Sequence, residues 1–126
     1  MAKVILIVDD DPMSLKLVRD VLHVSRYDTI EAINGKEGVE LAKSKKPALI
    51  LMDMRMPLMS GFEATRILKM DDTTKDIPIV AMTASVMKGD EGKIHQVGCD
   101  GYLSKPIDIR QLLIKVKEYL PVDKVE

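Results

Sequence analysis

The chain has 126 residues, of which 46% are hydrophobic and 31% charged, a balance typical of a folded domain rather than a disordered chain. Its net charge of −1 excludes the overall basic character of most nucleic-acid-binding domains, and its single cysteine excludes an intramolecular disulfide. No apolar run is long enough to cross a bilayer, and a lone thiol favours a reducing compartment. We therefore expect one domain over residues 1–126, with a core from 3 to 120 and a frayed tail from 121 to 126. We expect it in the cytoplasm, without nucleic-acid binding or membrane insertion.

Short apolar segments alternate along the chain with segments of helical periodicity. Runs at Val4–Val8, Ala48–Met52 and Ile77–Met82 predict strands, and the first two are unbroken, as in strands covered on both faces. Weaker strands are expected at Thr29–Ile33 and Tyr102–Leu103. A β-α unit is thus repeated about five times, which predicts an α/β fold, a doubly wound parallel sheet with helices on both faces.

The helices are indicated by caps and by apolar spacing. Three pairs have the spacing of a capping box, namely Asn34 with Glu37, Ser60 with Glu63 and Asp108 with Gln111, and Pro12 suits a first helical turn. A weak helix is expected over Lys88–Val97, because Gly89 and Gly92 lower its propensity. The faces expected to pack on the sheet are Met13, Leu17, Val18, Val21 and Leu22 in the first helix, and Ile109, Leu112, Leu113, Val116 and Leu120 in the last.

Polar residues follow the predicted strands. Asp9, Asp10 and Asp11 come directly after the first strand, Asp53 after the third, Thr83 after the fourth, and Ser104 and Lys105 after the fifth. In open parallel sheets, ligands bind beyond the carboxyl ends of the strands, so these side chains should converge on one edge. Any of them alone would as readily be a helix cap or a loop residue. Their joint placement favours a site.

Converging carboxylates repel one another unless a cation compensates them. Mg²⁺ prefers oxygen ligands and commonly brings phosphate oxygens into its remaining positions, and Mn²⁺ is the alternative ion. A lysine and a hydroxyl at the same edge suit a phosphoryl group. The residues alone therefore favour a Mg²⁺-assisted phosphoryl site in which an aspartate is the covalent acceptor.

Four motifs carry a resemblance to a known family. They are the acidic group Val8–Pro12, the segment Leu51–Pro57 closed by Ser60-Gly61, the segment Val80–Ala84, and Tyr102-Leu103-Ser104-Lys105-Pro106. With these motifs in order, residues 3 to about 120 resemble the receiver domain of the response regulators of two-component signalling. Met87–Glu91 and Gly98-Cys99 are similar to stand-alone receivers of the CheY and DivK type and to receivers of hybrid kinases. The resemblance implies a flavodoxin-like fold with strand order 2-1-3-4-5 and five helices.

The resemblance also implies roles for the residues. Asp53 would be the phosphoacceptor, and Mg²⁺ would be held by Asp9, Asp10, Asp53 and the backbone carbonyl of Arg55. Thr83 and Lys105 would bind the phosphoryl oxygens, and Tyr102 would switch rotamers as Thr83 moves. The Lys105–Pro106 bond would be cis, and Asp11 matches no fixed position, so we expect it to be exposed or capping. The variable positions Arg55 and Ser85 would tune the lifetime of the phosphorylated state.

The implied partners are a sensor histidine kinase or a histidine phosphotransfer protein as phosphodonor, and a protein target for output, because the chain ends soon after its last helix. A monomer or weak dimer is expected, and a signalling switch rather than a turnover enzyme. One alternative is a Mg²⁺-dependent phosphohydrolase of the haloacid-dehalogenase type, with Asp9 as nucleophile and Asp11 two residues later. Another is a flavin or nucleotide carrier, although no glycine-rich phosphate loop follows the first strand.

Overall fold

Five strands alternate with five helices in the computed structural model, which describes residues 3–84 and 90–121. The sheet is parallel throughout and has the order β2-β1-β3-β4-β5, which confirms the expected topology. The elements are β1 (Val4–Val8), α1 (Pro12–Val24), β2 (Asp28–Ala32), α2 (Gly35–Lys45), β3 (Leu49–Asp53), α3 (Gly61–Met70), β4 (Ile79–Thr83), α4 (Asp90–Gln96), β5 (Gly101–Ser104) and α5 (Ile109–Tyr119).

The strand ends differ by one or two residues from those expected. β3 continues to Asp53 because the register pairs Asp53 with Met82, which keeps this carboxylate on a regular strand. β4 begins at Ile79 rather than at Ile77, since Pro78 has no N–H to donate to the ladder. β2 begins at Asp28, where it pairs with Val4.

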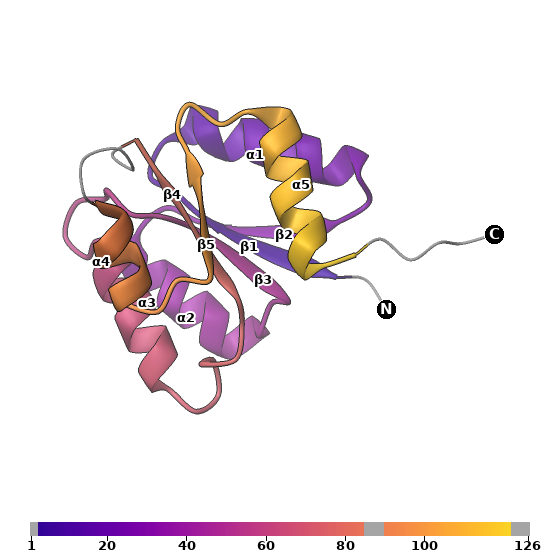
Figure 1. Ribbon diagram of the computed structural model, residues 1–126. Coiled ribbons are helices and arrows are strands. Elements are labelled where there is room, and N and C mark those ends of the chain that lie inside the picture. The colour runs from indigo at the N-terminus through magenta and orange to yellow at the C-terminus, as the bar shows by residue number, and fades with distance from the viewer. Residues whose placement is uncertain (1–2, 85–89, 122–126) are drawn as a thin grey trace.

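Two apolar layers cover the sheet, as the unbroken runs predicted. Alternate strand residues face opposite layers, so that Leu6 and Ile50 pack with α2, α3 and α4, while Ile5 and Leu49 pack with α1 and α5. Figure 1 shows α1 and α5 on one face and the other three helices on the other. The burial of both faces fixes the register, and the register fixes which side chains meet at the strand ends.

The buried face of α1 was predicted only in part. Val18 and Leu22 are buried, but Met13 is 75% exposed and Leu17 is exposed, while Leu15 packs into the core in their place. A residue lies about 100° around a helix from its neighbour, so Met13, five positions before Val18, lies about 140° away from it. In α5, Leu112 and Val116 are buried as expected, whereas Ile109 is exposed.

The expected helix starts are confirmed by their caps. The backbone N–H groups of Glu37, Glu63 and Gln111 donate to the side chains of Asn34, Ser60 and Asp108 at 2.8, 3.2 and 3.0 Å. Pro12 stands in the first turn of α1, and Asp11 is the N-cap, accepting from the Met13 N–H at 3.1 Å.

Some expectations concern residues outside the described ranges. The weak helix expected from Lys88 is described as α4 from Asp90 to Gln96, and Gly89 lies outside the description. Ser85 and the tail from 122 to 126 also lie outside it. Within the described ranges, no helix combines the length and the apolar character needed to cross a membrane.

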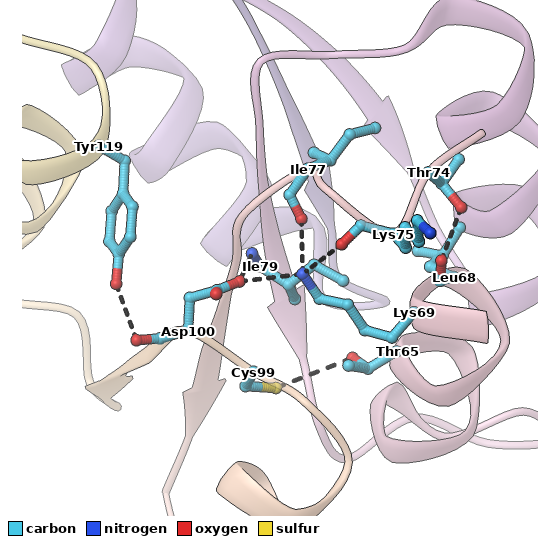
Figure 2. Close-up of polar contacts among 10 residues, drawn as sticks. All are labelled: Thr65, Leu68, Lys69, Thr74, Lys75, Ile77, Ile79, Cys99, Asp100 and Tyr119. Atoms are coloured by element: carbon cyan, nitrogen blue, oxygen red, sulfur yellow. Dashed lines mark hydrogen bonds and ion pairs between the residues drawn. The ribbon is translucent and has the colours of Figure 1, made fainter. Parts of the chain in front are cut away.

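A polar cluster, the Lys69 cluster, ties together the edge of the sheet at which β4 and β5 begin (Figure 2). The ammonium of Lys69 donates to the carbonyls of Lys75 and Ile77, at 3.1 and 2.9 Å, and to Oδ2 of Asp100 at 3.1 Å. The same Asp100 oxygen accepts from the Ile79 N–H at 2.8 Å, and the Asp100 carbonyl accepts from the Tyr119 hydroxyl at 2.8 Å. The cluster thereby joins α3, β4, β5 and α5.

Candidate functional site

The polar residues predicted at the strand ends meet at one edge of the sheet. Asp53 ends β3 and Thr83 ends β4, next to Asp53's partner Met82. The Lys105 N–H donates to the Thr83 carbonyl at 2.9 Å, which extends the β4–β5 pairing by one residue. Asp9 directly follows β1, and its N–H donates to the Ala32 carbonyl at 3.0 Å. Parallel pairing alone thus brings together residues up to 96 positions apart.

Lys105 lies between two buried carboxylates. Its ammonium is 2.8 Å from Oδ2 of Asp9 and 3.4 Å from Oδ2 of Asp53. The remaining oxygens accept from backbone N–H groups, Oδ1 of Asp9 from Asp11 at 2.9 Å and Oδ1 of Asp53 from Arg55 at 3.1 Å. Asp9 is fully buried and Asp53 is 3% exposed, so Lys105 is shared by two carboxylates that water hardly reaches.

Burial, together with the neighbouring charges, changes the proton affinity of the site. Burial raises the pKa of Asp53 to about 6, and the charge of Asp9 adds to the increase, while the Arg55 N–H and the Lys105 charge oppose it. Burial alone would lower the pKa of Lys105, but the hydrogen bond to Asp9 and the charge of Asp53 outweigh it, so this pKa is raised. Lys105 therefore stays charged, and the ionised form of Asp53 is destabilised.

A third carboxylate completes an acidic group. Asp9, Asp10 and Asp53 each offer an oxygen, and these oxygens all lie within 4.8 Å of one another. Asp10 is exposed, whereas the other two are buried, so the group is open to solvent on the Asp10 side. Among the described residues, Lys105 is the one lysine beside these three oxygen donors, and such a donor set fits a hard divalent cation.

Gly61, at the start of α3, packs closely against the end of β3. Its N–H donates to the Met54 carbonyl at 3.2 Å, and a Cβ at this position would overlap the backbone of Asp53 and Met54, only 2.1 Å from the Asp53 carbonyl oxygen. Only glycine allows the start of α3 to approach so closely. Gly61 was expected only as part of a motif, and this contact was not foreseen from the sequence. A glycine directly after the N-cap Ser60 was the available signal.

The other expected site residues lie around this centre. Thr83 is buried, and Arg55 is exposed beside Asp53. The Lys105–Pro106 bond is cis. Tyr102 is half-buried, and its ring meets the ring of His95 edge-on at a centroid distance of 6.4 Å. Ser85, the second expected tuning residue, lies outside the described ranges.

Residues 5–117 match the sequence profile of the response regulator receiver domain. The chain belongs to the response regulator receiver family. It is 46% identical over 120 residues to the polar-differentiation response regulator DivK of Brucella anthropi, which covers 95% of this chain and 98% of that protein. It is 44% identical over the same length to the DivK protein of Brucella ovis.

Solved structures show the same fold. The chemotaxis protein CheY4 of Vibrio cholerae superposes with a TM-score of 0.89 at 27% identity, covering 94% of this chain and 99% of that chain. The receiver domain of the sensor histidine kinase PA1611 from Pseudomonas aeruginosa gives 0.89 at 28% identity, covering 97% and 100%, and that structure holds a magnesium ion coordinated in the active-site cleft. This receiver is thus a signalling domain that is activated by phosphorylation, with a kinase as its partner. It is not a turnover enzyme.

Proposed function

We propose that Asp53 is the residue that takes up the phosphoryl group. The observation that carries this proposal is the position of Asp53, which ends the central strand in a buried acidic group, 3.4 Å from the only ammonium that touches that group within the described residues. An ionised Asp53 oxygen attacks phosphorus, a new O–P bond forms, and the P–N bond of a phosphohistidine breaks. The imidazole leaves and takes up a proton.

Divalent metal binding fits the same residues. Asp9, Asp10 and Asp53 would supply carboxylate oxygens, and the Arg55 carbonyl would supply a fourth oxygen for Mg²⁺ or Mn²⁺. When bound, the ion would offset the excess negative charge and stabilise the charge on the transferring phosphoryl oxygens. The related PA1611 receiver, which holds magnesium in its cleft, supports this assignment.

The protein's own cation and hydroxyl would hold the product. Lys105 is close enough to Asp53 to reach a phosphoryl oxygen, and Thr83 ends the neighbouring strand. A shift of Thr83 toward the phosphoryl group would open space for the half-buried Tyr102 ring. That local change would alter the surface of β5 and α4, which is how phosphorylation would change binding to a protein target.

The phosphodonor would be a sensor histidine kinase or a histidine phosphotransfer protein, in the cytoplasm, and residues 1–126 would act as one receiver domain. Asp9 is the weaker candidate for the acceptor, because it is fully buried and holds Lys105 more closely, at 2.8 Å against 3.4 Å for Asp53. That arrangement speaks against a hydrolase in which Asp9 is the nucleophile.

Labelling with a small phosphodonor tests the proposal. With phosphoramidate and Mg²⁺, wild-type protein should take up one phosphoryl group per chain, and Asp53→Asn should take up none while keeping its circular dichroism spectrum. Asp11→Asn is the matched control, since it changes an exposed capping carboxylate, and it should be labelled like the wild type. Equal labelling of Asp53→Asn would refute the acceptor assignment.

Metal affinity tests the second part. Removal of Asp10 deletes one proposed ligand and one charge, so Asp10→Ala should bind Mg²⁺ at least about tenfold more weakly in a titration. An unchanged affinity would show that the ion does not use Asp10.

A further inference from the structure

Two glycines of α2, Gly35 and Gly38, lie directly against the two segments that carry the acidic group. A Cβ at Gly35 would be 2.6 Å from the Met59 carbonyl oxygen, in the loop between β3 and α3. A Cβ at Gly38 would be 2.9 and 3.0 Å from the two methyl groups of Val8, the residue before Asp9. Both glycines are buried, and residues at this spacing share one face of a helix. The backbone of α2 therefore lies where a side chain would otherwise stand.

Val8 has little freedom to give way to an added methyl group. Its side chain is fully buried, and a β-branched residue has few rotamers. Its backbone is paired with Ala32 on one side and with Met52 on the other, so a push on Val8 is a push on the end of β1. Asp9 and Asp10 come directly after this end. A displacement of Val8 would thus be passed on to two of the three clustered carboxylates.

The loop that carries Met59 is anchored as well. Met54 and Met56 are buried in the core. Leu58, next to Met59, is 99% exposed at a φ of +69°, in the left-handed region that leucine rarely adopts, because the anchored backbone holds it outward. The Met59 atom closest to α2 is a backbone oxygen, which has no rotamer to change. A push at this oxygen would therefore move the segment that follows Asp53.

We infer that Gly35 and Gly38 are positioning residues for the acidic group, because they set the distance between the carboxylates after β1 and the donors at the end of β3. The inference rests on the proposed metal binding, in which Asp10 and the Arg55 carbonyl come from these two segments. Mg²⁺ needs near-ideal octahedral geometry at about 2.0–2.1 Å, whereas Ca²⁺ accepts irregular oxygen ligands at about 2.3–2.6 Å. Displaced donors should therefore weaken Mg²⁺ binding more than Ca²⁺ binding.

Titration of the metal-free chain with Mg²⁺ and with Ca²⁺, followed by NMR chemical shifts, measures this selectivity. Gly35→Ala and Gly38→Ala should each bind Mg²⁺ about tenfold more weakly than wild type, as when a residue that orients metal ligands is replaced. Their Ca²⁺ affinity should stay within about threefold of wild type, because Ca²⁺ tolerates irregular geometry. A merely structural role would weaken the binding of both ions alike.

Gly92→Ala is the matched control. Gly92 is also a helical glycine, in α4, but a Cβ at this position would meet no atom within 4 Å. Each of the three substitutions replaces glycine by a better helix former, so a difference between them reports the contact of the new methyl group. Gly92→Ala should bind Mg²⁺ and Ca²⁺ like the wild type.

A second-site variant tests the contact with Val8 itself. Val8→Ala removes both methyl groups that the new Cβ would meet, so the double variant Gly38→Ala/Val8→Ala should regain Mg²⁺ affinity to within about threefold of wild type. Val8→Ala also shortens a buried side chain and should lower the free energy of unfolding. Metal affinity would then recover while stability falls. If Gly35→Ala does not fold, the Gly38→Ala pair decides the inference.

Unchanged Mg²⁺ affinity in Gly38→Ala, equal losses for Mg²⁺ and Ca²⁺, or no recovery in the double variant would each overturn the inference. The Asp10→Ala titration separates this failure from a failure of the proposed metal binding. If Asp10→Ala loses Mg²⁺ affinity and the glycine variants do not, the metal site stands and only the positioning role is wrong. If Asp10→Ala binds Mg²⁺ like the wild type, the proposed ligand set is wrong and the inference falls with it.

Discussion

Two lysines lie against carboxylates at opposite edges of the same sheet, and their surroundings differ in one respect. Lys69 has one carboxylate, Asp100, and two backbone carbonyls, so its three donors are all used (Figure 2). Lys105 faces two buried carboxylates, and a third lies within 4.8 Å of both. A lysine–carboxylate pair by itself therefore does not mark a functional site. The excess of carboxylates over cations does, because that excess can be relieved by a metal ion.

The comparison predicts that only one of the two lysines matters for chemistry. Lys105→Met removes the cation beside Asp53 and should slow labelling by phosphoramidate in Mg²⁺ about 100-fold, as expected for the loss of one charge-stabilising donor. Lys69→Met should be labelled within about twofold of the wild-type rate. Similar rates for the two variants would remove the distinction between the two edges.

The burial of Asp53 beside another carboxylate should also show in stability. The pKa of Asp53 is about 6 in the folded chain against 3.8 for an ordinary aspartate, so between these pH values the folded chain holds a proton that the unfolded chain has lost. Wild-type stability should therefore fall as the pH rises from about 4 to 6. Asp53→Asn lacks this carboxylate, and we expect it to be more stable than wild type by about 3 kcal/mol at pH 7.

Urea unfolding at several pH values measures this difference, which should shrink toward pH 4. Asp72→Asn is the control, because its carboxylate is exposed, and its stability should follow the wild-type pH dependence. A constant difference between Asp53→Asn and wild type at all pH values would contradict the raised pKa of Asp53.

Replacing Lys69 should have the opposite effect to replacing Asp53, because the folded chain should lose stability rather than gain it. Lys69→Met leaves two carbonyls and the Asp100 carboxylate without their shared donor, and should lower the free energy of unfolding by about 1–2 kcal/mol. Lys16→Met, which removes an exposed ion pair with Asp20, should cost less than about 0.5 kcal/mol. Equal costs for both variants would make the Lys69 cluster an ordinary surface interaction.

The same contrast explains what the sequence could predict. Asp9, Asp53, Thr83 and Lys105 were placed correctly at one edge, because each stands within two residues of the end of an apolar run and parallel strands end together. The Lys69 cluster was not foreseen, since Lys69 and Asp100 are 31 residues apart and neither stands at a predicted strand end on the side where ligands bind.

Other details depended on tertiary packing that local patterns do not contain. The apolar spacing of the first helix included Met13 and missed Leu15, because the direction of contact with the sheet decides which stripe is buried. The outward position of Leu58 follows from the buried side chains around it, and apolarity alone would have placed it in the core.

The smallest expected effect concerns Arg55, which is exposed beside the acidic group. A long, permanently charged side chain at this position should shield the phosphoryl group from in-line attack by water. Arg55→Ala should then lose its phosphoryl group about 3–10-fold faster than wild type, roughly 1 kcal/mol of barrier. The decay is measured in excess Mg²⁺ without kinase. Slower decay would mean that Arg55 assists the attack instead.

The central claim is that Asp53, at the edge with excess carboxylates, is the residue that becomes phosphorylated. Its most direct test is tandem mass spectrometry of wild-type protein labelled by phosphoramidate in Mg²⁺, with the acyl phosphate trapped by borohydride before digestion. The account predicts that the modified residue is Asp53 alone. Modification of Asp9 would contradict it and would support the hydrolase alternative.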